Sequence, residues 1–301
     1  MNKGKVIKIT CLTIFFLMLG GVGLGMWSIS NFIGKMEKVE LDESRLDANE
    51  EVTKNIVNIA LLGIDNEGGK GRSDSIMILT IDELNKKLKL TSIMRDSYVE
   101  IPGKEGKDKI NHAYAFGGAE LTIKTLNNNF GLNIKDFMAV KMESLPTIID
   151  KLGGVDINIA EDEVGMIDGV DSVGVYTLNG EQALAYARIR YTDGGDARRT
   201  SRHRNILNSI FEKLKLTPLE EYPDLISEFL PYVQSSLDTS EVLSLGAKFA
   251  TLIPNGLEQE RFPRDKDIKN IEVDGIYYLD FDNEIVRNEI KGYIFDDKLE
   301  K

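Results

Sequence analysis

The longest apolar segment of the chain lies near its N-terminus. Residues 9–34 include 26 positions in a row without a charged side chain. At about 1.5 Å per residue, a helix of this length exceeds the roughly 30 Å hydrocarbon core of a bilayer. The pattern therefore predicts one transmembrane helix over residues 9–34.

Charges on either side of this segment predict its orientation. Three lysines precede it within residues 1–8, whereas the sequence after it is mixed and then acidic, KMEKVELDE. By the positive-inside rule, the N-terminal tail lies in the cytoplasm. We therefore predict a single-pass protein of the cell membrane, with a stalk at 35–53 and an extracellular domain at 54–301. A cleaved signal peptide is the alternative, but the segment is long for one and no A-x-A site follows it.

Beyond the stalk, apolar runs of strand length follow one another. They are residues 55–64 (NIVNIALLGI), 74–81 (DSIMILTI), 88–93 (LKLTSI) and 155–159 (VDINI). The first two are continuously apolar and do not alternate with polar residues. Such runs indicate strands that are covered on both faces, as in α/β domains.

Amphipathic segments between and after these runs predict helices. In order along the chain, they are 119–129 before Gly131, a short helix after Ser144, a helix after Asn179-Gly180, the longest helix from Asp196 or Thr200 to about Lys215, a helix near 240–251, and a strand–helix pair over 276–294. No linker divides these elements. The sequence thus predicts one α/β domain in which a central mixed sheet lies between helices.

Composition narrows the possible functions. The formal net charge is −12 and the sequence pI is about 4.9, which argues against general nucleic-acid binding. Cys11 is the one cysteine of the chain, so it forms no intramolecular disulfide and no thiolate metal site.

Against this acidic background, residues 186–204 (YARIRYTDGGDARRTSRHR) contain six arginines and one histidine. The planar guanidinium fork matches phosphate oxygens, so clustered arginines favour a phosphate or pyrophosphate ligand. On the predicted long helix, Arg199 and His203 continue the apolar face, where a charged group is costly to bury without a partner. A bound anion is one such partner. Salt bridges to acids elsewhere in the chain are the alternative.

Two aspartates lie at strand boundaries. Asp65 ends the first predicted strand and Asp74 begins the second, with a glycine-rich loop between them. Paired carboxylates of this kind can hold Mg²⁺ and leave positions for phosphate and water, although strand-ending aspartates are often turn residues. The loop is not a P-loop, because it lacks the required lysine and Ser/Thr directly after Gly68. Arg95 and Asp96 directly follow the third strand and form a further candidate site.

Seven segments together resemble the LytR-CpsA-Psr family. In order they are LLGID, GRSDSIMILTID, SIMRDSYVEIPG, KINHAYAFGG, LGGVDINI, LNGEQALAYARIR and GDARRTSR. They extend from about residue 55 to residue 204, roughly half of the chain, and the predicted topology is also similar. Two positions depart from the family pattern: Met94 stands where proline is usual, and His203 stands where glutamine is common.

The resemblance implies an α/β domain with a long hydrophobic cleft for the polyprenyl tail of a lipid-linked precursor. It implies transfer of a glycopolymer (teichoic acid, capsule or another secondary wall polymer) from undecaprenyl pyrophosphate to peptidoglycan. By similarity, Asp65 and Asp74 bind Mg²⁺, with Mn²⁺ as an alternative. The expected contacts to the pyrophosphate come from Arg72, Arg95, Arg188, Arg190, Arg199, Arg202 and His203.

The implied reaction is a phosphoryl transfer in which a peptidoglycan hydroxyl attacks the phosphorus nearer the glycan. Asp96 or one of the metal-binding aspartates would accept the hydroxyl proton, and the sequence does not choose between them. A phosphatase or a lipid-phosphate binding protein is the first alternative, since water can replace the sugar acceptor. A transcriptional regulator is the second, but the eight residues before the membrane segment are too few for a DNA-binding domain.

Overall fold

The computed structural model of the chain describes residues 36–49, 56–65, 71–141, 144–189, 230–238 and 257–298. It also describes single positions between these ranges: Arg202, Asn205, Ile206, Ser209, Lys213, Glu241, Val242, Ser244, Leu245, Lys248, Leu252 and Asn255. Residues 9–34 lie outside this part of the chain. Within it, no helix has both the length and the apolar character needed to cross a bilayer. The transmembrane segment and the orientation built on it therefore stay predictions.

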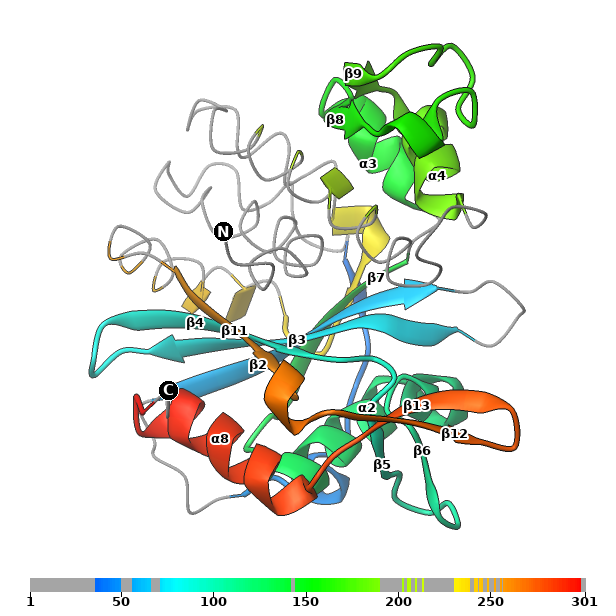
Figure 1. Ribbon diagram of the computed structural model, residues 1–301. Coiled ribbons are helices and arrows are strands. Elements are labelled where there is room, and N and C mark those ends of the chain that lie inside the picture. Colours follow the sequence, from blue (N-terminus) through cyan, green and yellow to red (C-terminus); the bar gives the residue numbers. More distant parts are fainter. Residues whose placement is uncertain are drawn as a thin grey trace.

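A seven-stranded mixed sheet forms the centre of the molecule (Figure 1). Its strands, in spatial order, are β1 (Glu37–Lys38), β10 (Val233–Ser235), β7 (Asp136–Lys141), β2 (Ile56–Asp65), β3 (Arg72–Asp82), β4 (Lys87–Ile93) and β11 (Leu257–Phe262). Strands β2, β3 and β4 pair antiparallel, whereas β7 pairs with β2 and β11 with β4 in parallel. The predicted α/β fold with a mixed central sheet is thus confirmed.

Helices lie on both sides of the sheet (Figure 1). One side carries α2 (His112–Phe130) and α8 (Asn283–Phe295). The other carries α3 (Leu145–Lys151) and α4 (Gly180–Arg188), together with the hairpin of β8 (Val155–Ile159) and β9 (Gly174–Leu178). This arrangement explains why the central residues of β2 (59–62) and β3 (76–79) are all apolar: both faces of these strands are buried there.

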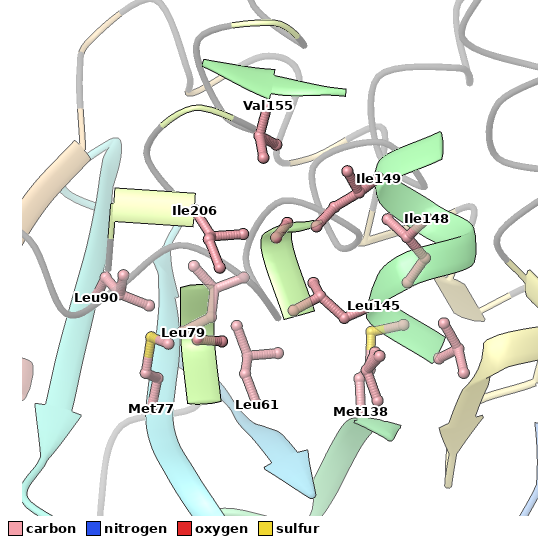
Figure 2. Packing of buried hydrophobic residues seen from close by; sticks show 14 of the residues in the cluster. Leu61, Met77, Leu79, Leu90, Met138, Leu145, Ile148, Ile149, Val155 and Ile206 are labelled. Carbon is pink, nitrogen blue, oxygen red and sulfur yellow. The ribbon is translucent and has the colours of Figure 1, made fainter. Parts of the chain in front are cut away.

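Neighbouring residues of each central strand belong to different cores. Leu61 and Met77 pack toward α3, β8 and Ile206, in the cluster that Figure 2 shows. Leu62 and Ile76, their neighbours along the chain, pack with residues of α2 and α8 on the opposite face. This alternation follows from the two-residue period of a strand. A shift of one residue in register would exchange the two cores.

Helix α2 begins earlier than predicted and contains a kink. Its residues Gly117 and Gly118 have non-helical backbone angles, and the φ of Gly118 is 63°. The regular part after the kink matches the predicted helix. Gly131 ends the helix in the left-handed region, with a φ of 64°, and its backbone N–H donates to the carbonyl of Asn127. Glycine is favoured at both places because it has no Cβ to oppose a positive φ.

Two short hairpins lie next to each other beside this helix in Figure 1. They are β5 (Tyr98–Glu100) with β6 (Lys107–Lys109), and β12 (Lys269–Val273) with β13 (Ile276–Asp280). A backbone bond from Leu279 N to Asp96 O, 2.9 Å long, connects the second hairpin to the segment that follows β4. Both hairpins therefore lie next to the candidate residues Arg95 and Asp96.

The segment predicted as a stalk is part of the folded domain where the structure describes it. Strand β1 pairs in parallel with β10 at the edge of the sheet. Leu46 is completely buried, and its carbonyl accepts a 2.9 Å hydrogen bond from Asn127 Nδ2. A few scattered apolar residues among many charged ones produce no periodic pattern, so the sequence did not reveal this packing.

A buried lysine holds the C-terminal end of α8. Lys89, in the middle of β4, has no exposed surface. Its Nζ donates to the carbonyls of Tyr293 (2.6 Å) and Ile294 (3.3 Å) and lies 3.2 Å from Asp297 Oδ1. The last carbonyls of a helix have no intrahelical partner and carry partial negative charge. A cation at this place both donates hydrogen bonds to these carbonyls and offsets their charge.

We expect Lys89→Met to lower the free energy of unfolding by about 2–3 kcal/mol, because the helix carbonyls lose a charged donor inside the core. Urea unfolding followed by circular dichroism measures this loss. Lys87→Met is the matched control: Lys87 lies on the same strand and also binds Asp297, but it is partly exposed, and its removal should cost less than about 1 kcal/mol. Equal losses in the two variants would refute the role of Lys89.

Candidate active site

The candidate residues of the first half of the chain gather at one edge of the sheet. Asp65 is the last residue of β2, and Asp74 lies near the start of β3, its antiparallel neighbour. Arg95 and Asp96 lie in the turn that follows β4. Because β3 pairs with both β2 and β4, antiparallel pairing brings these three chain positions together.

A β-bulge determines how Asp74 is presented. Gly63 pairs with Ser75 and Ile64 pairs with Ser73, so Asp74 is an extra residue without a partner on β2. A bulge redirects the side chain of the inserted residue and interrupts the alternation of faces. As a consequence, Arg72 lies directly across from Asp65 in the ladder.

Asp74 is held by two donors from different elements. Arg95 Nη1 lies 2.6 Å from Asp74 Oδ2, and Asn111 Nδ2 donates to Asp74 Oδ1 over 2.8 Å. Each carboxylate oxygen retains a lone pair after one hydrogen bond, so both remain able to bind a cation. The Asp74 side chain is 17% exposed and that of Arg95 15%, so the pair is largely, but not fully, removed from water.

The network continues from Arg95 to Asp96 and Lys109. Arg95 Nε lies 3.4 Å from Asp96 Oδ2, and Lys109 Nζ lies 2.7 Å from Asp96 Oδ1. Negative and positive groups therefore alternate from Asp74 to Lys109. Each charge lies beside an opposite one, which offsets the cost of partial burial and fixes the orientation of Arg95.

Two residues of this network, Lys109 and Asn111, were not among the predicted site residues. Both belong to the segment KINHAYAFGG, where β6 ends and α2 begins. Backbone bonds attach this segment to the site: Asn111 N donates to Arg95 O (3.3 Å), and Ser73 N donates to Asn111 O (3.4 Å). Polar residues at a strand–helix boundary were the available signal, but such residues are common in turns.

Arg202 has a structural partner, which is the alternative that the sequence left open. Only 1% of the residue is exposed, and its Nε lies 2.7 Å from Glu163 Oε1. Its Nη1 also donates to the carbonyl of Ile189, directly after α4, over 2.9 Å. The described contacts thus make Arg202 a buried link between α4 and the 3-10 turn at Glu161–Glu163. Its predicted contact to the pyrophosphate stays a prediction.

The remaining arginines are described only in part. Arg72 and Arg188 are exposed, at the start of β3 and the end of α4. Arg190, Arg199 and His203 lie outside the described residues. Their predicted contacts to a pyrophosphate stay predictions. The same holds for the hydrophobic lipid cleft.

The carboxylates of Asp65 and Asp74 suit a metal ion that takes its remaining ligands from water or substrate. Within the described ranges, no group of three or more His, Cys, Asp or Glu residues is placed to hold a metal ion. Asp65 and Asp74 could therefore supply only part of a coordination shell. Mg²⁺ is commonly bound through one or two carboxylates, with water and phosphate oxygens completing the shell. The donor set fits such an ion.

Comparison with known proteins identifies the family of the chain. A profile described as the LytR_cpsA_psr family matches residues 27–291. The polyisoprenyl-teichoic acid–peptidoglycan teichoic acid transferase TagU of Enterococcus faecalis is 33% identical over 262 residues, which cover 83% of this chain and 85% of that protein.

Solved structures show the same fold. The LytR-CPS2A-psr family protein YwtF (TagT) of Bacillus subtilis, with bound octaprenyl pyrophosphate lipid, has a TM-score of 0.60 and 26% identity. The match covers 85% of this chain and 99% of that one. TagT bound to LIIa-WTA has a TM-score of 0.59 and 26% identity, over 80% and 91% of the two chains. On the profile match and the TagU relative, the chain belongs to the LytR-CpsA-Psr family.

Proposed function

We propose that this protein transfers an anionic glycopolymer, of the teichoic acid class or a related wall polymer, from a polyprenyl pyrophosphate carrier to peptidoglycan. The observation that carries the proposal is the network of Asp74, Arg95, Asp96 and Lys109, beside Asp65, at one edge of the sheet. The names of the relatives support it, since TagU is a teichoic acid transferase and TagT has been solved with a polyprenyl pyrophosphate. Membrane anchorage through residues 9–34 would keep the site close to a lipid substrate.

The residues of the site have separate tasks in this proposal. Asp65 and Asp74 would hold Mg²⁺ or Mn²⁺, which would offset negative charge on the diphosphate. Arg95 is oriented by carboxylates on two sides and can donate to a diphosphate oxygen. Arg72, Arg188, Arg190 and Arg199, with His203, would supply further donors around the same group.

The reaction exchanges one phosphorus–oxygen bond for another. A peptidoglycan sugar hydroxyl attacks the phosphorus nearer the glycan, and a new bond forms between that oxygen and the phosphorus. The bridging bond of the diphosphate breaks, and polyprenyl phosphate leaves with the electron pair. The hydroxyl proton passes to a carboxylate of the site. Asp96 is one candidate for this role, because it lies at the same edge without serving the predicted metal.

Product analysis tests the proposal. Full-length protein is incubated with a polyprenyl-pyrophosphate-linked glycopolymer, Mg²⁺ and peptidoglycan, and the products are analysed by mass spectrometry. We expect glycan covalently joined to peptidoglycan and an equal amount of polyprenyl phosphate. Polyprenyl phosphate with free glycan phosphate would identify a phosphatase, and lipid bound without any product would identify a binding protein. Either result would overturn the transferase proposal.

A further inference from the structure

A polar pocket of about 700 Å³ lies away from the network described above. Residues 99–104 and 106–107 of the β5–β6 hairpin form one wall. The other wall consists of Asn128 and Asn129 at the end of α2, with Asn283 and Arg287 from the first turns of α8. Its size lies within the range of ordinary ligand sites.

Positive charge predominates in this pocket. Lys104, Lys107 and Arg287 line it, against Glu100 as the single acid among the lining residues. In the described part of the chain, none of the three cations forms a salt bridge. Lys104 Nζ lies 4.3 Å from the ring centroid of Phe116, Lys107 Nζ lies 5.8 Å from that of Tyr98, and Arg287 Nη1 donates to Asn128 O over 3.4 Å. In a chain whose net charge is −12, this local excess of cations favours an anionic ligand.

The β5–β6 hairpin connects the pocket to the candidate active site. Strand β5 begins two residues after Asp96 and ends at Glu100, in the pocket wall. At no more than about 3.3 Å per residue, the Cα of Glu100 lies at most roughly 13 Å from that of Asp96. On β6, Lys109 binds Asp96, and Lys107, two residues earlier on the same face, lines the pocket. Basic side chains thus lead from the network to the pocket.

The chemistry of the lining residues indicates what the ligand contains. Cations suit phosphate oxygens, and amide side chains such as Asn128 and Asn283 can donate to and accept from hydroxyl groups. A diester of phosphate with a polyol or a sugar offers both kinds of group. A polyprenyl tail offers neither.

We propose that this pocket binds a phosphodiester unit of the glycopolymer itself, while the diphosphate end of the same substrate lies at Asp74 and Arg95. The identity of the polymer rests on the proposed function. The preference for a hydroxylated polyanion rests on the pocket alone. Such a second contact would hold the part of the polymer nearest the diphosphate along the β5–β6 hairpin and select for anionic polymers.

The test measures binding of a labelled glycerol phosphate oligomer to full-length protein in detergent by fluorescence anisotropy. The pocket variant carries Lys104→Ser, Lys107→Ser and Arg287→Ser. The matched control carries Lys38→Ser, Lys269→Ser and Lys298→Ser, which removes the same charge from exposed positions that do not line the pocket. We expect binding to weaken about tenfold in the pocket variant, allowing for solvent screening of the cations, and to remain unchanged in the control. A double variant with only Lys104→Ser and Lys107→Ser should show part of this loss. It replaces the triple variant if the change at Arg287, which lies close to Gly131, impairs folding.

Equal affinities of the pocket variant and the control would overturn this inference. So would displacement of the oligomer by inorganic phosphate at the same phosphate concentration, because a single phosphate would then explain the binding. Polyprenyl pyrophosphate affinity and transfer products are measured separately. If the oligomer binds the wild type and the control but not the pocket variant, the result supports the pocket as the binding site. This holds even if the wild type forms no transfer product, in which case only the proposed function fails.

Discussion

Replacement of Asp74 by asparagine should reduce glycopolymer transfer at least a hundredfold while the protein stays folded. Asparagine retains the shape of the side chain, but it removes the negative charge that would hold Mg²⁺ and that orients Arg95 from 2.6 Å away. Loss of one preorganised electrostatic group at a reacting centre costs on the order of 10²- to 10³-fold in rate. Transfer is measured at saturating Mg²⁺ with the product assay described above.

Asp82→Asn is the control for this experiment. Asp82 ends the same strand at its other end, is buried, and accepts hydrogen bonds from the backbone and side chain of Asn85. Its replacement removes a carboxylate that is even more deeply buried but lies far from the network, so transfer should remain near the wild-type rate. Near-normal activity of the Asp74 variant would exclude Asp74 from the site. An equal loss in both variants would indicate a general effect on folding.

Replacement of Arg202 by alanine should lower the free energy of unfolding by about 3–5 kcal/mol, the usual cost of leaving one partner of a buried ion pair alone. Glu163, the partner of Arg202, is itself 3% exposed. The variant also leaves the carbonyl of Ile189 without its donor. Thermal or urea unfolding of the variant and the wild type measures the loss.

A double variant separates a structural role of Arg202 from a role in ligand binding. Arg202→Met with Glu163→Gln removes both charges, while glutamine can still accept the bond that Ala160 N donates to Glu163. Replacement of a buried pair by uncharged side chains is often nearly neutral, so most of the stability should return. Polyprenyl pyrophosphate should then bind as tightly as to the wild type. A stable double variant that fails to bind this lipid would show that Arg202 contacts the substrate.

The pH dependence of stability should reflect the contacts of Asp297, near the C-terminus, with strand β4. Hydrogen bonding to Lys87, and then to Lys89, lowers the pKa of Asp297 despite partial burial. A carboxyl whose pKa is lower in the folded state stabilises the fold above its ordinary pKa, and that stabilisation is lost as the pH falls through the folded value. Asp297 therefore contributes at neutral pH and ceases to do so in acid.

The central strands could be predicted from the sequence because each one contains its own run of apolar residues. Strands β2 and β3 each contain an unbroken run of apolar residues, at 59–62 and 76–79, since both faces of the sheet are covered there. The edge strand β11, with the sequence LEQERF, is only partly buried along most of its length and has no apolar pattern. Short strands such as β5 and β10 depend on their neighbours for stability, and three residues are too few to show a period.

The sequence by itself determined that Asp65, Asp74, Arg95 and Asp96 lie at strand ends, because apolar runs stop there and adjacent antiparallel strands bring their ends together. It also determined the excess of arginine near the end of α4. Only the tertiary structure decided which of these groups meet. The bulge at Asp74, the contact of Asn111 with its carboxylate and the burial of Arg202 against Glu163 depend on residues distant in sequence. Such pairings produce no local pattern, since they arise when packed elements bring donors and acceptors within hydrogen-bonding distance.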